Sequence, residues 1–132
     1  MKSDVTGQHA MCKVLIVEDD DLNMMLFNDV LQVHGYETLQ AKNGQEALLT
    51  ARLHRPDLIV MDIDLPEMSG MEVTKRLKAD ESLRSIPVIA VTALAMRGDE
   101  EMIRKAGCQS YLSKPFSIAG FMQAVEHYCG WH

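Results

Sequence analysis

Hydrophobic residues along the chain recur in two alternating patterns. Short runs rich in apolar and β-branched residues, typical of buried strands, occupy residues 13–17, 36–40, 57–61, 87–92 and 110–113. Longer segments with helical spacing lie between and after them, at residues 21–34, 44–54, 70–79, 99–106 and 117–128. Strands that alternate with helices form parallel sheets covered on both faces. The pattern therefore predicts an α/β fold, a doubly wound five-stranded parallel sheet with five helices.

Residues that begin and end helices agree with this division. Gly35 and Gly107 stand where helices should end, because glycine adopts the left-handed conformation of a helix terminus. The stretch "SGME" at 69–72 has the pattern of a capping box. Asp20 and Asp21 precede the first helix, where carboxylates accept hydrogen bonds from free amides and interact favourably with the helix dipole. We interpret these two aspartates as caps rather than metal ligands.

Polar residues follow the predicted strands at the places where doubly wound sheets bind their ligands, beyond the carboxyl ends. An acidic pair follows the first strand, a single aspartate the third, a threonine ends the fourth, and a lysine follows the fifth. In the flavodoxin-like strand order 2-1-3-4-5, the first and third strands are neighbours, so their acidic residues converge. The residues concerned are Glu18, Asp19, Asp62, Thr92 and Lys114.

The chemistry of such a cluster points to a metal and a phosphoryl group. Crowded carboxylates repel one another unless a cation is present. Oxygen ligands with open positions are typical of Mg²⁺, and no His/Cys set in the sequence suggests zinc. An aspartate can also act as a nucleophile and form an aspartyl phosphate. Phosphoryl transfer then needs a positive side chain and a hydroxyl donor, which Lys114 and Thr92 supply. We therefore hypothesise a Mg²⁺-dependent phosphoacceptor, Asp62.

Length, charge and cysteines limit the alternatives. A chain of 132 residues is about one domain; we expect residues 11–132 to form it and the polar residues 1–10 to be a disordered tail. The net charge of -6, without a cluster of Lys and Arg, argues against direct nucleic-acid binding. No apolar run is long enough for membrane insertion. Cys12, Cys108 and Cys129 are odd in number and lack CxxC spacing, so we expect no disulfide framework and a cytoplasmic protein.

Four stretches together carry a family resemblance, namely "VLIVEDD", "LIVMDIDLPEMSGMEV", "IPVIAVTALA" and "GCQSYLSKPF". They resemble the receiver domain of two-component response regulators, over nearly all of residues 12–129. The stretches "NMMLF" and "TALAMRGDEE" are most similar to single-domain cell-cycle regulators of this family and to the receivers of hybrid kinases. The resemblance implies that Asp62 accepts a phosphoryl group from a histidine kinase or histidine phosphotransferase, and that a downstream signalling protein senses the change.

The resemblance also implies roles for individual residues. Those for Mg²⁺ are Glu18, Asp19, Asp62 and the backbone carbonyl of Asp64, and those for phosphoryl binding and switching are Thr92, Ala93, Tyr111 and Lys114. We favour the carbonyl of Asp64 over its side chain because a near-octahedral Mg²⁺ site tolerates few extra charges. Tyr111 could instead simply cover the edge of the core with its hydroxyl in water. Pro115 makes the preceding peptide bond a candidate for the cis form, in a turn that aims the lysine inward.

Two surfaces are candidates for partner contacts. The first helix has more apolar residues than one buried stripe requires, and Leu22 and Met25 fall on a face beside the predicted core. A docking face for the phosphodonor and an overfilled core explain this excess equally well. Met96 and Met102, around the fourth helix, are candidates for contacts that sense phosphorylation. We expect a monomer or a weak dimer.

Other functions share parts of this chemistry. A haloacid-dehalogenase-like phosphatase also uses an aspartate nucleophile, Mg²⁺ and a lysine, but its nucleophile follows the first strand. A nucleotide-binding flavodoxin-like module would need a Gly-rich phosphate loop after the first strand, which is not present. A receiver excised from a hybrid kinase, or a phosphate sink, keeps the same chemistry and stays open. We expect a signalling protein that assists its own phosphorylation and dephosphorylation rather than an enzyme.

Overall fold

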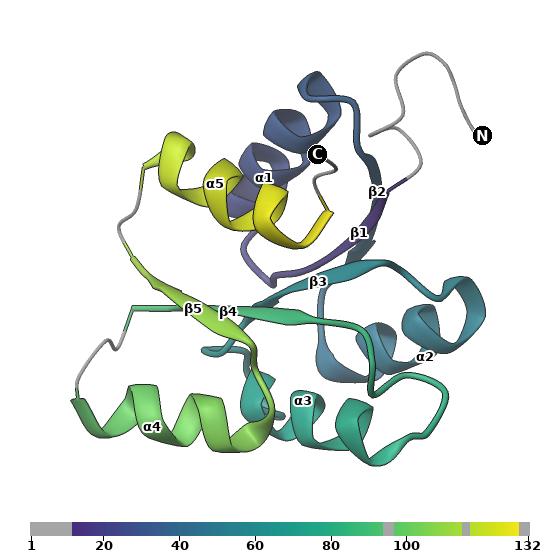
Figure 1. The fold of residues 1–132 in the computed structure, drawn as a ribbon, viewed down its shortest axis with the longest axis vertical. Coiled ribbons are helices and arrows are strands. Elements are labelled where there is room, and N and C mark those ends of the chain that lie inside the picture. The colour runs from purple at the N-terminus through teal and green to yellow at the C-terminus, as the bar shows by residue number, and fades with distance from the viewer. Residues whose placement is uncertain (1–11, 94–96, 115–116, 130–132) are drawn as a thin grey trace.

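Five strands and five helices alternate along the computed structural model, which describes residues 12–93, 97–114 and 117–129 (Figure 1). The strands are β1 (Lys13–Val17), β2 (Glu37–Ala41), β3 (Leu58–Asp62), β4 (Val88–Thr92) and β5 (Ser110–Ser113). The helices are α1 (Asp21–Val33), α2 (Gly44–His54), α3 (Gly70–Ala79), α4 (Arg97–Ala106) and α5 (Ile118–Cys129). Every predicted element is confirmed: four have the predicted bounds, and the ends of the others differ by one or two residues.

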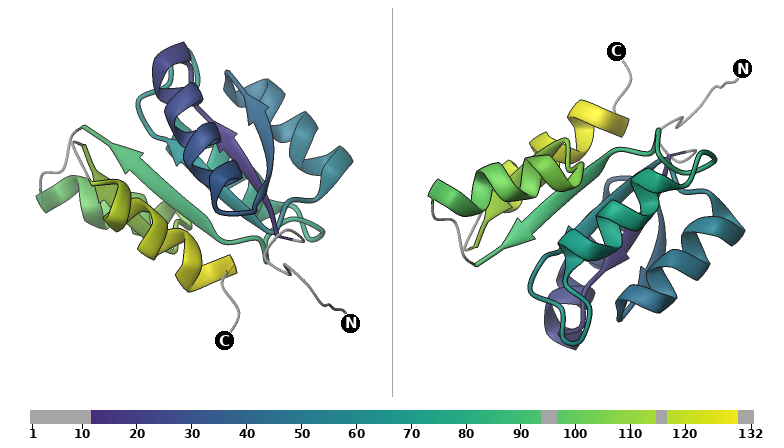
Figure 2. Two further views of the ribbon diagram at one scale, coloured as in Figure 1. Left: turned by 90° about the horizontal axis from the view of Figure 1, so that it is seen from above. Right: turned by 90° about the horizontal axis from the view of Figure 1, so that it is seen from below.

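The strands form one parallel sheet in the order β2-β1-β3-β4-β5, as predicted. Helices α1 and α5 cover one face, and α2, α3 and α4 cover the other (Figures 1 and 2). Because the strands are parallel, their carboxyl ends lie along the same edge of the sheet. This edge therefore collects the loops that follow β1, β3, β4 and β5, which hold the candidate site residues.

Two hydrophobic cores result from the alternation of side chains along the strands. In β1, Val14 and Ile16 pack toward α1 and α5, whereas Leu15 and Val17 pack toward the helices of the other face. In β3 and β4 every residue is buried, as expected for central strands covered on both faces. The central strands are consequently rigid supports for the residues at their ends.

Most of the predicted helix caps are present. Asp20 caps α1, and its side chain accepts hydrogen bonds from the amides of Leu22 and Asn23. Asp21 is not a second cap: it is the first residue of α1 and forms an ion pair with Lys42. Gly35 and Gly107 both have positive φ at the ends of helices, as predicted.

The predicted capping box at α3 is only half formed. Ser69 accepts a hydrogen bond from the Met71 amide at 3.1 Å, but the Glu72 carboxylate does not return to the cap. It accepts a hydrogen bond from Arg76 Nε at 3.2 Å instead. The reciprocal part of that prediction is therefore wrong, because an arginine one turn along the helix competes for the carboxylate.

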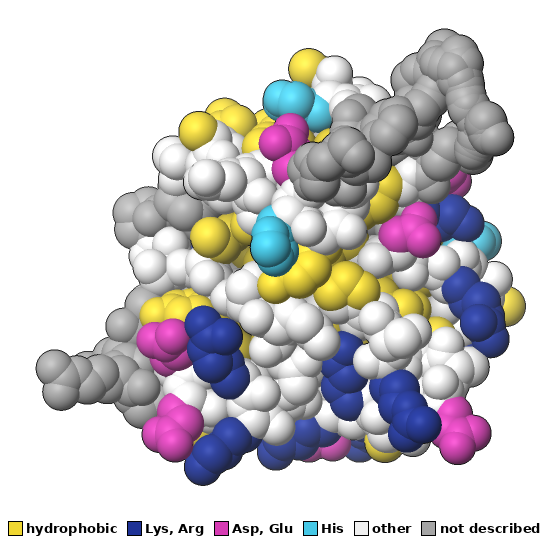
Figure 3. Space-filling model, in the orientation of Figure 1, with side chains coloured by type: hydrophobic (Ala, Val, Ile, Leu, Met, Phe, Trp, Pro, Cys, Tyr) yellow, Lys and Arg dark blue, Asp and Glu magenta, His cyan; other side chains and the backbone are white. Residues whose placement is uncertain are grey.

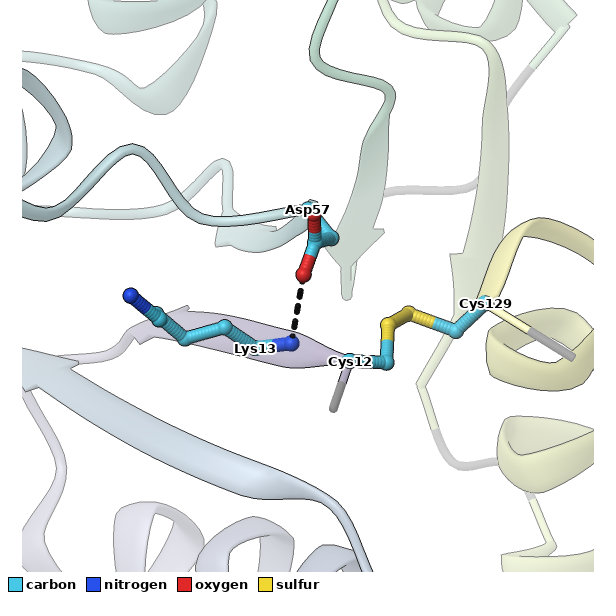
Figure 4. The surroundings of a disulfide bond; sticks show 4 residues. All are labelled: Cys12, Lys13, Asp57 and Cys129. Carbon is cyan, nitrogen blue, oxygen red and sulfur yellow. Dashed lines mark hydrogen bonds between the residues drawn. A yellow bond between two sulfur atoms is a disulfide. The ribbon is translucent and has the colours of Figure 1, made fainter. Parts of the chain in front are cut away.

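A disulfide joins Cys12, just before β1, to Cys129 at the end of α5 (Figure 4). The two Cα atoms lie 6.0 Å apart although 117 residues separate them in the sequence. The expectation of separate thiols is wrong for this pair and confirmed for Cys108, which is free and buried. Cysteine number and spacing cannot reveal a pairing that depends on where the fold places two distant residues.

Basic and acidic side chains are mixed on the face shown in Figure 3. Lys and Arg side chains gather over its lower half, around α3 and α4, with Asp and Glu among them. Pairs spaced four residues apart account for part of this mixture: Glu72–Arg76, Glu100–Arg104 and Glu101–Lys105. These pairs are exposed, so each contributes only about 0.3–0.5 kcal/mol. Within the described ranges, no helix combines the length and apolar character that a membrane span requires.

Candidate functional site

Three carboxylates meet at the carboxyl edge of the sheet. Glu18 and Asp19 follow β1, Asp62 ends β3, and these strands are neighbours with Val17 paired to Met61. One oxygen of each carboxylate lies within 4.8 Å of the other two. Glu18 and Asp62 are almost fully buried, whereas Asp19 is exposed to solvent. The fold thus brings together the three acidic residues that the sequence indicated.

Glu18 lies in an environment that disfavours its charge. Its Oε2 accepts a hydrogen bond from the Asp20 amide at 3.2 Å, but its buried Oε1 has no hydrogen-bond partner among the described residues. Burial, and then the nearby charge of Asp62, raise the pKa of Glu18 to about 7. A divalent cation would satisfy Oε1 and remove the repulsion between the carboxylates. The oxygen ligands, their spacing and this unsatisfied atom all fit Mg²⁺.

Lys114 brings a positive charge to Asp62. Its Nζ lies 3.5 Å from Asp62 Oδ1, and the lysine side chain is three-quarters buried. The Lys114 amide also donates a hydrogen bond to the Thr92 carbonyl at 2.7 Å, which holds the turn after β5 against the end of β4. Asp62 Oδ1 also accepts a hydrogen bond from the Asp64 amide at 2.9 Å. An ion pair from one loop and a hydrogen bond from another therefore orient this carboxylate.

A link between two loops of the site was not predicted from the sequence. The Asp64 carboxylate crosses to the end of β4 and accepts a hydrogen bond from the Ala93 amide at 3.0 Å. Thr92, the residue before this amide, is buried at the end of β4. No local spacing could have indicated a bond across 29 residues. The Asp64 carboxylate is thus engaged by a backbone amide, while a metal role for the Asp64 carbonyl stays a prediction.

Gly70 allows the loop after β3 to fold tightly against the site. A Cβ atom at this position would lie 2.3 Å from the Asp62 carbonyl oxygen and 2.9 Å from Ile63 Cα. The Gly70 amide donates a hydrogen bond to the Ile63 carbonyl at 3.1 Å, and Ser69 caps the helix that begins there. Since the obstacle is backbone, no side chain can be accommodated without moving the strand end that carries Asp62.

Tyr111 is tied to the fourth helix. It lies in β5 opposite Ala90, its ring packs against the core beneath α4, and its hydroxyl donates a hydrogen bond to Glu100 Oε1 at 3.1 Å. Glu100 also forms an ion pair with Arg104 at 3.3 Å. The alternative of a hydroxyl surrounded only by water is therefore wrong. Sequence reasoning missed Glu100, whose only signal was its place in the first turn of α4.

The predicted contact residues that the structure describes are exposed. Leu22 and Met25 on α1 are 71% and 53% exposed, and Met102 on α4 is 54% exposed. Leu26 and Val33 extend the exposed apolar face of α1, so these side chains do not overfill the core. Residues 94–96, which include the candidate Met96, and residues 115–116, which include the proline of the predicted turn, lie outside the described residues.

The strand order and the acidic cluster at the carboxyl ends of β1 and β3 define a receiver domain. The family described as the response regulator receiver domain matches residues 14–126, and the chain belongs to this family, as the sequence resemblance predicted. The polar-differentiation response regulator DivK of Brucella anthropi is 61% identical over 117 residues, which cover 89% of this chain and 95% of DivK. DivK of Brucella ovis is 60% identical over the same length.

Solved structures of receiver domains have the same fold. The receiver domain of a sensor histidine kinase from Pseudomonas aeruginosa, solved with a magnesium ion coordinated in its active-site cleft, is 34% identical with a TM-score of 0.83. The match covers 91% of this chain and 98% of that domain. The chemotaxis protein CheY4 of Vibrio cholerae is 28% identical with a TM-score of 0.85, over 89% of this chain and 98% of CheY4.

Proposed function

We propose that this chain is a phosphoacceptor in which Asp62 takes a phosphoryl group from the phosphohistidine of a kinase or phosphotransferase. The observation that carries the proposal is the cluster of Glu18, Asp19 and Asp62, whose oxygens lie within 4.8 Å of one another, with Lys114 beside the acceptor. The similarity to DivK, over 95% of the length of DivK, supports the proposal that this chain regulates cell division or polarity. The phosphorylated form then acts through contacts with a downstream protein.

The chemistry follows from the positions of the side chains. An oxygen of Asp62 attacks phosphorus, a P–O bond forms as the P–N bond to the donor histidine breaks, and the released imidazole takes up a proton. Lys114 Nζ, 3.5 Å from Asp62 Oδ1, offsets the negative charge of the transferred group. Glu18, Asp19, Asp62 and the Asp64 carbonyl would hold Mg²⁺, which supplies further positive charge for the phosphoryl oxygens.

Labelling of Asp62 tests the proposal directly. The full chain is incubated with Mg²⁺ and either acetyl phosphate or a phosphorylated histidine kinase, and the acid-labile label is quantified. Asp62→Asn should abolish the label, whereas Glu81→Gln, which changes an exposed acidic residue just after α3, should leave it unchanged. Full, Mg²⁺-independent labelling of the Asp62→Asn variant would sink the assignment.

Variants of the neighbouring residues separate metal binding from transfer. Removing both Glu18 and Asp19 should weaken Mg²⁺ binding, because two of the three clustered carboxylates are lost. Lys114→Ala should leave Mg²⁺ binding intact and impair transfer or signalling. Isothermal titration with Mg²⁺ measures the first effect and labelling measures the second. An unchanged Mg²⁺ affinity in the double acidic variant would contradict the metal site.

We propose that phosphorylation is sensed through Thr92 and Tyr111. A phosphoryl group on Asp62 presents oxygens that can accept hydrogen bonds from the Thr92 hydroxyl and the Ala93 amide. Without a phosphoryl group, the Ala93 amide donates to the Asp64 carboxylate, so a phosphoryl oxygen would take the place of that carboxylate. Movement of Thr92 toward the site then leaves space for Tyr111 to turn inward. In the form described here the hydrogen bond to Glu100 holds the tyrosine against α4.

Two variants test whether docking and output use different surfaces. Met25→Asp places a charge on the exposed apolar face of α1 and should slow transfer from the phosphodonor. Tyr111→Ala should weaken the phosphorylation-dependent gain in downstream binding, which we expect to be about 1–3 kcal/mol as for typical allosteric couplings. Phosphotransfer rates and binding titrations with both forms measure these effects. The reverse pattern would exclude this division of surfaces.

The similarity to a kinase receiver domain favours a second candidate, a phosphate sink or relay receiver. Such a protein returns its phosphoryl group to a histidine phosphotransferase and needs no downstream partner. Phosphotransfer followed in both directions distinguishes the two: rapid return of label without any phosphorylation-dependent binding identifies the sink, and a stable phosphorylated form with a binding partner identifies the regulator.

A further inference from the structure

The disulfide between Cys12 and Cys129 lies at the end of the sheet opposite the phosphoacceptor. Cys12 precedes β1 and Glu18 follows it, so six residues of extended chain, about 20 Å, separate this bond from the acidic cluster. Both cysteines are half-buried and pack against the hydrophobic cluster beneath α1 and α5. Their chemistry therefore has no part in phosphoryl transfer and requires its own explanation.

The strand side of this pair is firmly anchored. The Cys12 carbonyl accepts a hydrogen bond from the Glu37 amide at 3.1 Å, which joins it to β2. The adjacent Lys13 amide donates to Asp57 Oδ2 at 2.8 Å (Figure 4). The Asp57 amide in turn donates to the Lys13 carbonyl at 2.8 Å. The backbone around Cys12 is consequently fixed by contacts to both neighbouring segments before any sulfur bond forms.

The helix side is held by packing. Phe121, Met122 and Val125 of α5 are buried in the cluster, and the Phe121 ring lies 5.0 Å from that of Phe27 in α1. These contacts position the helix so that its last residue faces the start of β1. With Cα atoms 6.0 Å apart, the two cysteines are within the range that a disulfide spans without backbone movement. The fold thus holds the two sulfurs at a high effective concentration.

The third cysteine differs from this pair. Cys108 is buried and its thiol donates to Thr74 Oγ1 at 3.7 Å. Burial raises the pKa of Cys108, which lowers the fraction of reactive thiolate. An oxidant in solution therefore reacts with Cys12 and Cys129 in preference to Cys108.

We propose that Cys12 and Cys129 are a reversible thiol–disulfide site that fastens the end of α5 to the start of β1. The oxidant is a small-molecule disulfide such as oxidised glutathione. One deprotonated cysteine attacks it, which forms a mixed disulfide and releases one small thiol. The second deprotonated cysteine attacks the protein sulfur of that mixed disulfide, which forms the intramolecular bond and releases the second small thiol. Excess reduced thiol reverses both steps.

Oxidation has a mechanical consequence for α5. The bond closes most of the chain into one loop, which restricts the unfolded chain, and it prevents the last turn of α5 from separating from the sheet. A disulfide of typical strength raises the midpoint of thermal unfolding of a domain of this size by about 10 °C. Amide hydrogen exchange in the last turn of α5 should slow as well, while phosphorylation of Asp62 proceeds at the same rate.

The test uses the full chain purified in reduced form and equilibrated with mixtures of oxidised and reduced glutathione. Free thiols are blocked with an alkylating reagent and counted by mass spectrometry, and the melting midpoint and the labelling rate of Asp62 are measured on the same samples. We expect Cys12 and Cys129 to disappear together as a monomeric intramolecular bond, which dithiothreitol reverses. Oxidised protein should melt about 10 °C higher.

Three serine variants complete the test. Cys108→Ser should keep both the bond and the shift in melting midpoint, whereas Cys12→Ser and Cys129→Ser should each lose both. Glutathione adducts on single cysteines, linked dimers, pairing with Cys108, or equal midpoints for oxidised and reduced wild-type protein would each overturn the proposal. Since the labelling rate is measured separately, failure of this site is distinguishable from failure of the phosphoacceptor.

Discussion

Replacing Glu18 by glutamine tests whether its buried carboxylate destabilises the protein when no cation is bound. Burial and the charge of Asp62 raise the pKa of Glu18 from 4.5 to about 7, while the hydrogen bond from the Asp20 amide and, less strongly, the charge of Lys114 oppose this increase. Asp19 also lies within the cluster. A pKa difference of about 2.5 corresponds to about 3 kcal/mol at 1.36 kcal/mol for each pKa unit. This is the largest gain in stability that removing the charge can produce.

The pH dependence follows from the direction of the change. The folded pKa of Glu18 is above its ordinary value, so the folded protein binds this proton more tightly than the unfolded chain does. The contribution of Glu18 to stability is therefore most favourable below pH 4.5. It falls as pH rises from 4.5 to about 7, and it stays unfavourable above that pH.

Urea unfolding at pH 5 and pH 8, with EDTA or with Mg²⁺, measures this effect. In EDTA at pH 8, the free energy of unfolding of Glu18→Gln should be higher than that of the wild type by up to about 3 kcal/mol. The reason is that the amide oxygen still accepts the hydrogen bond from the Asp20 amide but carries no charge. At pH 5 the gain should be much smaller. Mg²⁺ should stabilise the wild type by mass action and stabilise the variant far less.

The matched control is Glu81→Gln, which neutralises an exposed glutamate. It should change stability by less than about 0.5 kcal/mol at either pH. A Glu18→Gln protein that is less stable than the wild type at pH 8 in EDTA, or that gains as much at pH 5 as at pH 8, would refute the reasoning about the buried charge.

Three further substitutions test individual contacts. Gly70→Ala should lower the free energy of unfolding by at least about 1–3 kcal/mol and slow the labelling of Asp62, because the new Cβ would collide with the backbone of Asp62 and Ile63. A variant as stable in urea as the wild type would contradict this. Glu100→Gln removes the charged acceptor whose hydrogen bond raises the pKa of Tyr111, so that pKa should fall in an NMR titration of labelled tyrosine, and an unchanged value would exclude the contact. Asp64→Asn removes the negative charge that is bonded to the Ala93 amide at the site. Loss of the phosphoryl label should be faster, because this charge no longer repels the attacking water; slower loss of label would contradict the prediction.

The amino-acid sequence was sufficient to predict the strands and helices and the residue types at their ends. Short apolar, β-branched runs and helical spacing are local patterns, so the ends of the five strands and five helices could be assigned to within two residues. The caps at Asp20 and Ser69 and the glycines that end helices are local as well. Because parallel strands place their carboxyl ends at one edge, the meeting of Glu18 with Asp62 also followed once the strand order was assumed.

Contacts that depend on register and side-chain direction could not be predicted before the chain was seen folded. The Asp64 carboxylate bonds to the Ala93 amide across two loops, and Tyr111 bonds to Glu100 across a strand and a helix. Neither pair has a sequence spacing that marks it. The bond between Cys12 and Cys129 spans nearly the whole chain. Such partners become neighbours only when packing has fixed the helices on the sheet, and for that physical reason no local pattern encodes them.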